Sequence, residues 1–353
     1  MGEKVLMKGN EAIAEAAIRA GCKLFFGYPI TPQTEVSAYM AKRLPKIGGV
    51  FLQAESEVAA INMVYGAAST GKRVMTSSSS PGISLKQEGI SYIAGSDLPC
   101  VILNIVRGGP GLGGIQPAQS DYFQATKGGG HGDYRLIVLA PASIQEIVDI
   151  TKDAFELSEK YRVPVMVLGD GMIGQMMEPI EFGDESEVVV PERDYATNGT
   201  GLKREHNITN SLYIEPDVLE KTVLERYERY AKIEENEVRV EEYMTDDAEY
   251  VIAAYGTTAR IAKTAIAKLR AEGIKVGLIR PITLWPFPSK NFEEISKKVK
   301  GILSVEMSMG QMVEDVRLAV NGACPVEFFG RTGGVVPTPD EIVNALKKMK
   351  EGK

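Results

Sequence analysis

In the first half of the chain, short segments that are apolar at every position alternate with longer segments that have the pattern of a helix. This alternation constrains the fold more than any other feature of the sequence. A strand that is apolar on both faces must be covered on both faces, which is typical of a parallel sheet between helices. The sequence therefore predicts an α/β domain with a parallel sheet. The expected strands are 23–29, 49–55, 73–80, 98–107 and 163–170, and the expected helices are 10–21, 32–44, 56–70, 82–95 and 143–161.

The pattern divides the chain into three parts. Residues 1–183 form the first α/β domain, and residues 184–244 are a polar, turn-rich linker that ends in a charged helix. Alternation of strand and helix patterns returns in 245–353, a length that is usual for a domain. We therefore expect a second, smaller α/β domain after the linker.

Composition excludes several classes of protein. Of 353 residues 44% are hydrophobic and 25% charged, and the net charge of −7 comes without a cluster of Lys and Arg, which argues against a nucleic-acid or anionic-membrane surface. No stretch approaches the ~18 apolar residues of a membrane helix, and the N-terminal residues become charged too early for a secretory signal. We expect a cytoplasmic protein.

The three cysteines, Cys22, Cys100 and Cys324, are far apart in the sequence, and no two form a C-x-x-C pair. The chain cannot by itself supply four thiolates to an iron-sulfur cluster or to a structural zinc ion. They are expected to be reduced.

Chemically capable residues follow four expected strands of the first domain. Thr31 follows the first, Glu57 the second, the group Ser80, Pro81 and Gly82 the third, and Arg107 the fourth. Ligands of parallel sheets bind at the carboxyl ends of the strands. The sequence therefore predicts a binding site made from these positions.

Two of these residues also have ordinary structural explanations. Thr31 can be a helix N-cap with Pro32 at the first helical position, although this leaves Pro29 unexplained. Arg107 can be a surface arginine before the loop "GGPGLGG", or it can clamp a carboxylate with its planar fork. The sequence leaves both alternatives open.

Glu57 is a more specific candidate. An acidic residue in a first helical turn can simply complement the helix dipole, but this helix continues "VAAINMVYGAA" and is apolar on nearly every face, so the carboxylate is expected to enter the interior. A buried carboxylate needs a partner or a raised pKa. Glu55 is close by and stays an alternative.

Three motifs resemble cofactor-binding sequences without the required context. "GAASTGKR" at 66–73 ends a helix and has Arg73 where a P-loop needs Ser or Thr, and "GGPGLGG" leads into no clear helix that could hold a pyrophosphate. "GDG" at 169–171 with Asn198 downstream copies the spacing of a thiamine-diphosphate magnesium motif, but coil containing Pro179 and Pro191 stands where that motif needs a helix. We interpret all three as coincidences.

Long phrases of the sequence resemble the α-type subunit of 2-oxoacid:ferredoxin oxidoreductases. They include "GYPITP" (27–32), "QAESEVAAINMVYGAAS" (53–69) and "GLIRPITLWPFP" (277–288), while "KQEGISY" (86–92) and "KGGGHGDYR" (127–135) are most similar to the enzymes for branched-chain 2-oxoacids such as 2-oxoisovalerate (3-methyl-2-oxobutanoate). The 2-oxoglutarate enzymes come second. The resemblance implies a pyrimidine-type thiamine-diphosphate-binding domain followed by a transketolase C-terminal-like domain.

The resemblance also implies roles for individual residues. Glu57 would bind the pyrimidine ring nitrogen of thiamine diphosphate and activate the cofactor, and Thr31 and Arg107 would bind the 2-oxoacid. The pyrimidine pocket would further include Tyr28, Pro29, Ile30, Ser80, Pro81 and Gly82. The segment 107–123 would cover the substrate.

The resemblance places the diphosphate-bound Mg²⁺ and the iron-sulfur clusters on other chains. The implied partners are a diphosphate-binding β-type subunit, a γ-type subunit and a ferredoxin-like subunit, with coenzyme A as second substrate. Without them the chain is expected to form homo-oligomers. Two other hypotheses stay open, a non-catalytic assembly subunit and a nicotinamide-dependent dehydrogenase, although the latter would need a glycine fingerprint with a downstream acidic residue.

Overall fold

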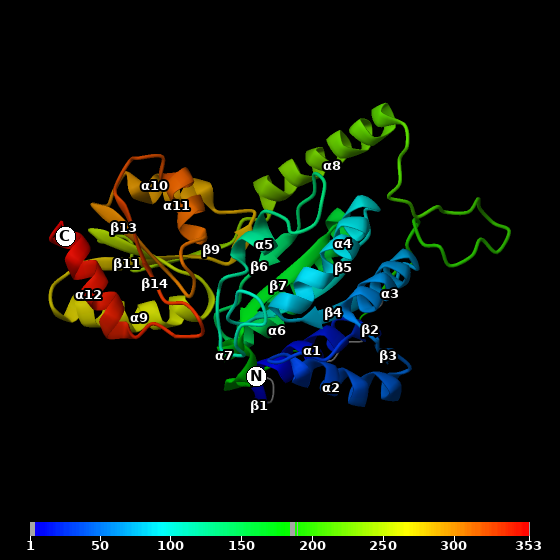
Figure 1. The fold of residues 1–353 in the computed structure, drawn as a ribbon, viewed down its shortest axis with the longest axis horizontal. Coiled ribbons are helices and arrows are strands. Elements are labelled where there is room, and N and C mark those ends of the chain that lie inside the picture. Colours follow the sequence, from blue (N-terminus) through cyan, green and yellow to red (C-terminus); the bar gives the residue numbers. More distant parts are fainter. Residues whose placement is uncertain (1–3, 184–187, 189, 353) are drawn as a thin grey trace.

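The computed structural model describes residues 4–183, 188 and 190–352. Figure 1 shows two α/β domains side by side, the first coloured blue to green and the second yellow to red, with helix α8 (Pro216–Asn236) lying along one side. Each domain has its own central sheet. The prediction of two α/β domains is confirmed.

The first domain is built on a seven-stranded sheet with the strand order β12-β6-β7-β5-β4-β2-β3. Strands β2 to β7 run parallel to one another, whereas the edge strand β12 pairs antiparallel with β6. Strands β4, β5 and β7 are buried at every residue, as expected for a sheet that helices cover on both faces. The bounds are β2 Leu24–Gly27, β3 Val50–Gln53, β4 Val74–Ser78, β5 Cys100–Val106, β6 Ile137–Leu139, β7 Pro164–Asp170 and β12 Thr283–Trp285.

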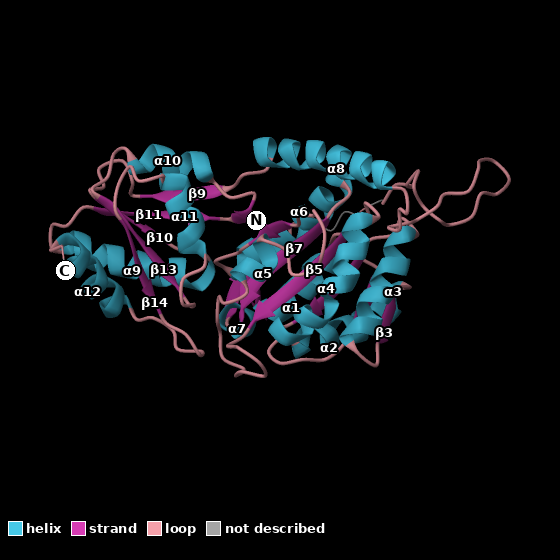
Figure 2. Ribbon diagram, turned by 45° about the horizontal axis from the view of Figure 1, so that its top comes forward, coloured by secondary structure: helices cyan, strands magenta, loops and turns pink. Residues whose placement is uncertain are grey.

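Two groups of helices cover this sheet: α1 packs against α2 and α6, and α3 packs against α4 (Figure 2). A separate antiparallel pair, β1 (Val5–Lys8) and β8 (Met177–Ile180), joins the two ends of the domain. The helices are α1 Gly9–Arg19, α2 Thr34–Arg43, α3 Glu57–Ser69, α4 Ser80–Gly95, α5 Tyr122–Thr126, α6 Ile144–Tyr161 and α7 Gly171–Gln175, with a 3-10 turn at Leu44–Ile47.

The second domain has a five-stranded sheet in the order β14-β13-β10-β11-β9, parallel except for β9. Its strands are β9 Val240–Tyr243, β10 Tyr250–Ala253, β11 Val276–Pro281, β13 Gly301–Glu306 and β14 Val326–Gly330. Its helices are α9 Gly256–Ala271, α10 Ser289–Ser296, α11 Met312–Val320 and α12 Pro339–Lys350.

The structure differs from the sequence prediction at two places between the domains. Strand β9 lies within 184–244, where a linker with a charged helix is expected, and it pairs with β11 of the second sheet. Strand β12 follows β11 in the sequence but pairs with β6 of the first sheet. The two domains are therefore joined by a strand as well as by the connecting chain.

Helix α8 lies within 184–244, where a charged helix is expected, and ion pairs hold it on the first domain. Arg226 donates from Nε to Asp97 Oδ1 at 3.0 Å, and it donates from Nη2 to the Gly95 carbonyl at 3.0 Å. Tyr230 and Ile233 of α8 are buried. The charged helix thus rests on the end of α4 rather than lying free in solvent.

Candidate active site

The residues predicted from the sequence lie at one edge of the first sheet. Because β2, β3, β4 and β5 are parallel, their carboxyl ends meet at the same edge, and Thr31, Glu57, Ser80 and Arg107 follow these ends. Hydrogen bonds between a side chain of one residue and the backbone of another join Arg107 to Thr31 and to Ser80.

Three amide side chains hold the turn after β2, of which Asn10 and Gln33 are buried and Gln175 is exposed. Asn10 Nδ2 donates to the Pro32 carbonyl at 2.7 Å, and Gln175 Nε2 donates to the same oxygen at 3.1 Å. Gln33, which is fully buried, donates from Nε2 to the Tyr28 carbonyl at 3.3 Å. The turn that contains Tyr28, Pro29, Ile30 and Thr31 is therefore fixed, and Thr31 is exposed.

Helix α2 begins at Thr34, so the prediction of Pro32 as its first residue is wrong. The N-cap residue is Gln33, and its side chain makes no capping hydrogen bond because it reaches back to Tyr28. Thr31 is consequently not the N-cap of α2. Its ordinary structural explanation does not apply.

Arg107 is buried, with 8% of its surface exposed, and is not a surface arginine. It donates from Nη1 to the Thr31 carbonyl at 2.9 Å and from Nη2 to the Leu112 carbonyl at 3.1 Å. Among the described residues no acceptor lies within hydrogen-bonding reach of Arg107 Nε. A guanidinium has five N–H donors, so this side chain ties two loops together and still has donors for a ligand.

Ser80 links Arg107 to the end of β5. The Arg107 amide donates to Ser80 Oγ at 3.1 Å, and the Ser80 amide donates to Asn104 Oδ1 at 3.2 Å. Asn104, fully buried, donates from Nδ2 to Asp121 Oδ2 at 2.9 Å. Burial raises the pKa of the Asp121 carboxyl, although hydrogen bonds from Asn104 and Ser80 oppose the rise.

Glu57 begins helix α3 but does not cap it. Ser56 is the N-cap, and its hydroxyl accepts from the Ala59 amide at 3.2 Å. Glu57 is buried with 6% of its surface exposed, whereas Glu55 is exposed. Burial therefore favours Glu57 over the alternative that the sequence left open.

Gly82 makes room for the Glu57 carboxylate. A Cβ at Gly82 would stand 2.6 Å from Glu57 Oε1 and 3.1 Å from Glu57 Cγ, and it would overlap Ser78 Oγ. Both distances are shorter than ordinary van der Waals contact. The first turn of α4, which contains Ser80, Pro81 and Gly82, is therefore shaped around Glu57.

Two buried hydroxyls at this edge were not predicted from the sequence. Ser78 is the last residue of β4 and Ser79 is the next residue, and both are fully buried. Within the described part of the chain, neither Oγ atom has a hydrogen-bond partner. The run "TSSSS" was an available signal, because polar residues at the end of a buried strand point to a ligand site. Unpaired buried hydroxyls, an unpaired guanidinium nitrogen and the space beside Gly82 fit an aminopyrimidine ring, which offers donors and acceptors in one plane.

Two of the three motifs that resemble cofactor-binding sequences have structural roles. Arg73 of "GAASTGKR" is buried and binds Glu159 at 2.6 Å and Glu156 at 2.7 Å. Asp170 of "GDG" caps α7 by accepting from the amides of Met172 and Ile173 at 2.9 and 3.2 Å.

Asn198, the downstream residue of the "GDG" pattern, accepts from Arg204 instead, at 3.1 Å. No helix begins in the exposed loop that contains "GGPGLGG" before α5 at Tyr122. None of the three motifs therefore has the context that its cofactor would need.

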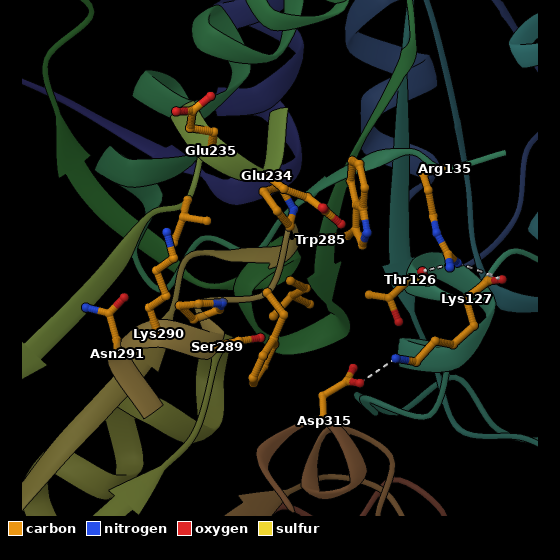
Figure 3. A pocket seen from close by; sticks show the side chains of 15 residues that line it. Thr126, Lys127, Arg135, Glu234, Glu235, Trp285, Ser289, Lys290, Asn291 and Asp315 are labelled. Carbon is orange, nitrogen blue, oxygen red and sulfur yellow. Dashed lines mark hydrogen bonds and ion pairs between the residues drawn. The ribbon is translucent and has the colours of Figure 1, made fainter. Parts of the chain in front are cut away.

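A separate pocket of about 590 Å³ lies between the domains (Figure 3). Arg135 and Lys127 line it from the first domain, Trp285 lines it from β12 of the first sheet, and Asp315 lines it from α11 of the second domain, with Lys127 and Asp315 paired across it. Arg135 precedes the amino end of β6, so the pocket lies at the opposite edge of the sheet from the candidate site. It contains none of the predicted site residues.

The described residues contain no group of three or more His, Cys, Asp and Glu side chains placed to hold a metal ion. All three cysteines are buried and free, and burial raises the thiol pKa of Cys22 and Cys100 to about 12. Among the described residues, no helix is long and apolar enough to span a membrane.

Comparison with known proteins assigns both domains. Residues 15–245 match the family described as pyruvate flavodoxin/ferredoxin oxidoreductase, thiamine diphosphate-binding, and residues 248–342 match pyruvate:ferredoxin oxidoreductase core domain II. The fold and the site at its sheet edge thus define a chain of the thiamine-diphosphate-dependent oxidoreductase class.

The ketoisovalerate oxidoreductase subunit VorB of Methanothermobacter thermautotrophicus is 51% identical over 98% of this chain and 97% of its own length. The 2-oxoglutarate synthase subunit KorA of Methanothermobacter marburgensis is 38% identical over 99% of this chain and all of its own length. The protein belongs to the family of 2-oxoacid:ferredoxin oxidoreductase subunits, which act only with partner subunits.

Two solved structures are similar. The 2-oxoglutarate:ferredoxin oxidoreductase of Magnetococcus marinus superposes with a TM-score of 0.88 at 29% identity over 98% of this chain, which spans 65% of that longer chain. A split-gene transketolase in an inactive β4 tetramer superposes with a TM-score of 0.61 at 16% identity and shows the fold alone. The expected transketolase-like architecture is confirmed.

Proposed function

We propose that this chain is the α-type subunit of a branched-chain 2-oxoacid:ferredoxin oxidoreductase and that Glu57 activates its thiamine diphosphate. The substrate class is supported by the 51% identity with a ketoisovalerate oxidoreductase subunit, against 38% with a 2-oxoglutarate synthase subunit. The main support for the site is that the Glu57 carboxylate is buried in the space left by Gly82.

Glu57 is suited to exchange a proton with a ring nitrogen. Its carboxylate is held in the first turn of α3, where Ser56 satisfies the helix cap and leaves the carboxylate free for a ligand. Proton transfer needs a group within hydrogen-bonding reach of the atom it serves. Bound thiamine diphosphate would supply an electron sink for decarboxylation, and Ser78, Ser79, Ser80, Pro81 and Gly82 would line the pyrimidine side together with Tyr28, Pro29 and Ile30.

Thr31 and Arg107 are proposed to hold the 2-oxoacid. Arg107 binds the Thr31 carbonyl at 2.9 Å, so the hydroxyl of Thr31 and the unpaired Nε of Arg107 belong to one rigid unit. A guanidinium recognises a planar carboxylate through parallel hydrogen bonds. Every 2-oxoacid carries this carboxylate, so the pair would orient the common part of the substrate.

Exposed apolar side chains around the site support a partner subunit there. Val58, Leu85, Leu112 and Ile115 are 43%, 54%, 83% and 57% exposed and lie on α3, α4 and the loop after Arg107. Such side chains around a binding site are typical of a surface that another protein covers. We propose that a diphosphate-binding β-type subunit covers it, that the complex also contains γ-type and ferredoxin-like subunits, and that the isolated chain self-associates instead.

The test is to co-express the chain with the products of its neighbouring genes and to measure viologen reduction with coenzyme A and a panel of 2-oxoacids. We expect 2-oxoisovalerate to give the highest kcat/KM. A preference for 2-oxoglutarate would reassign the substrate, and a complex that reduces viologen equally well without this chain would make it an assembly subunit.

A further inference from the structure

Helix α4 carries a fully buried lysine, Lys86, which has no role in the function proposed above. Lys86 shares one face of α4 with Gly82 and Gly89, four residues before it and three after it. A Cβ at Gly82 would meet Glu57, and a Cβ at Gly89 would stand 2.5 Å from Ile61 Cγ2, one helical turn along α3. Lys86 therefore lies on the face of α4 that packs against α3, between these two close contacts.

The ammonium group of Lys86 reaches the carboxyl end of β4. Its Nζ donates to Thr76 Oγ1 at 2.6 Å and to the Ser77 carbonyl at 3.1 Å. The Thr76 hydroxyl donates to the Phe26 carbonyl at 2.7 Å, which leaves its oxygen free to accept from Lys86. Both acceptors are neutral and stand just before Ser78, which lines the candidate site.

The ionisable groups that act on Lys86 are Glu57 on α3 and Cys100 on β5. Burial lowers the pKa of Lys86 to about 7, and the negative charge of Glu57 opposes this fall. Burial raises the pKa of the Cys100 thiol to about 12, so Cys100 is neutral near pH 7 and Glu57 is the carboxyl group whose charge acts on Lys86. A buried charge without an opposite charge is costly for the fold.

We propose that Lys86 is a positioning residue for Glu57: its ammonium is the counter-charge that keeps the Glu57 carboxylate turned toward the surface formed by Gly82 and Ser78. This inference rests on the proposed role of Glu57 at the pyrimidine ring. Lys86 itself touches neither substrate nor cofactor. It acts through the charge it places behind the carboxylate.

The pairing can be measured in the full chain without any cofactor. Lysine labelled with ¹³C at Cε is titrated by NMR, and the Lys86 signal is recognised by its low midpoint, since exposed lysines titrate near about pH 10.4. We expect Glu57→Gln to lower this midpoint by roughly one pH unit or more, because an opposite charge is removed. The matched control, Glu55→Gln, removes an exposed carboxylate and leaves the midpoint unchanged. A midpoint that is the same in the Glu57→Gln chain and the wild type overturns the proposal.

The consequence for the reaction is measured in the assembled complex. Lys86→Met keeps the length of the side chain and removes the charge, and we expect it to move the acidic limb of the pH profile of thiazolium C2 deuterium exchange upward by roughly one pH unit. A lysine that only fastens α4 to β4 would lower the melting temperature and leave the profile in place, which would overturn the inference.

The two experiments separate this inference from the proposed function. If Glu57→Gln leaves C2 exchange at the wild-type rate, the role of Glu57 at the cofactor fails, while the NMR titration still decides whether Lys86 and Glu57 are paired. If the Lys86→Met chain does not fold, the comparison of wild type, Glu57→Gln and Glu55→Gln is complete without it.

Discussion

Replacement of Gly82 by alanine should damage both the stability of the first domain and the activation of the cofactor. The added Cβ would stand 2.6 Å from Glu57 Oε1 and would overlap Ser78 Oγ, and Ser78 ends a fully buried strand that cannot move aside. Overpacking of this kind costs about 1–3 kcal/mol, and the gain of helix propensity from glycine to alanine returns about 0.5–1 kcal/mol of it.

The net loss from Gly82→Ala is therefore about 0.5–2 kcal/mol, which for a domain of this size lowers the Tm by roughly 1–8 °C. The Tm is read from the thermal transition of the full chain, and C2 deuterium exchange is measured in the complex. Exchange should be slower than in the wild type at every pH, because Glu57 must turn away from the site to make room for the methyl group.

The matched control is Gly66→Ala, also within a helix. A Cβ at Gly66 has no atom within 4 Å, and Gly66 is exposed on α3. Alanine there should raise stability by about 0.5–1 kcal/mol and leave exchange unchanged. A Gly82→Ala chain that is as stable as the Gly66→Ala chain, with normal exchange, would refute the argument that α4 is shaped around Glu57.

Two further predictions concern the substrate and the partner. Arg107→Lys should raise KM by roughly tenfold or more for every 2-oxoacid tested in the complex, because an ammonium cannot reproduce the planar fork; an increase for only one substrate would place Arg107 beside the substrate side chain. The isolated chain should show no micromolar binding of thiamine diphosphate with Mg²⁺ in a calorimetric titration, since Asp170 and Asn198 are engaged in other hydrogen bonds. Metal-dependent micromolar binding would mean that "GDG" is a cofactor site after all.

The buried parallel strands could be predicted from the sequence because burial on both faces leaves a direct mark on composition. Strands β4, β5 and β7 are buried throughout, and all three lie within predicted segments. Because neighbouring strands are parallel, their carboxyl ends lie at one edge of the sheet. The four candidate residues that follow strand ends in the sequence therefore lie at that edge.

Strand β12 could not be predicted as part of the first sheet. Its partner β6 is only three residues long, and the paired residues Thr283 and Leu139 are 144 positions apart in the sequence. The start of α2 was missed for a different reason. The local sequence suits Pro32 as a first helical residue, but Asn10 and Gln175 hold its carbonyl in a turn, and these contacts are distant in sequence.

Within the candidate site, the sequence indicated the polar residue Glu57 but not the residue proposed to pair with it. Glu57 stood out as a carboxylate in an apolar helix, whereas Lys86 stands in "SLKQEG", where nothing local distinguishes a buried lysine from a solvated one. The close approach of α3 and α4 at Gly82 and Gly89 buries it, and that approach is a tertiary contact.

The most direct test of the central claim is deuterium exchange at C2 of thiamine diphosphate in the reconstituted complex, with wild type, Glu57→Gln and Glu55→Gln compared under one condition. Glutamine preserves the size and the hydrogen-bonding capacity of Glu57 but cannot exchange the proton, so the loss should fall on cofactor activation. We predict that Glu57→Gln slows exchange by about 10²-fold or more with folding intact, and that Glu55→Gln exchanges at the wild-type rate. Exchange at the wild-type rate in the Glu57→Gln complex would contradict the assignment of this carboxylate as the group that activates the cofactor.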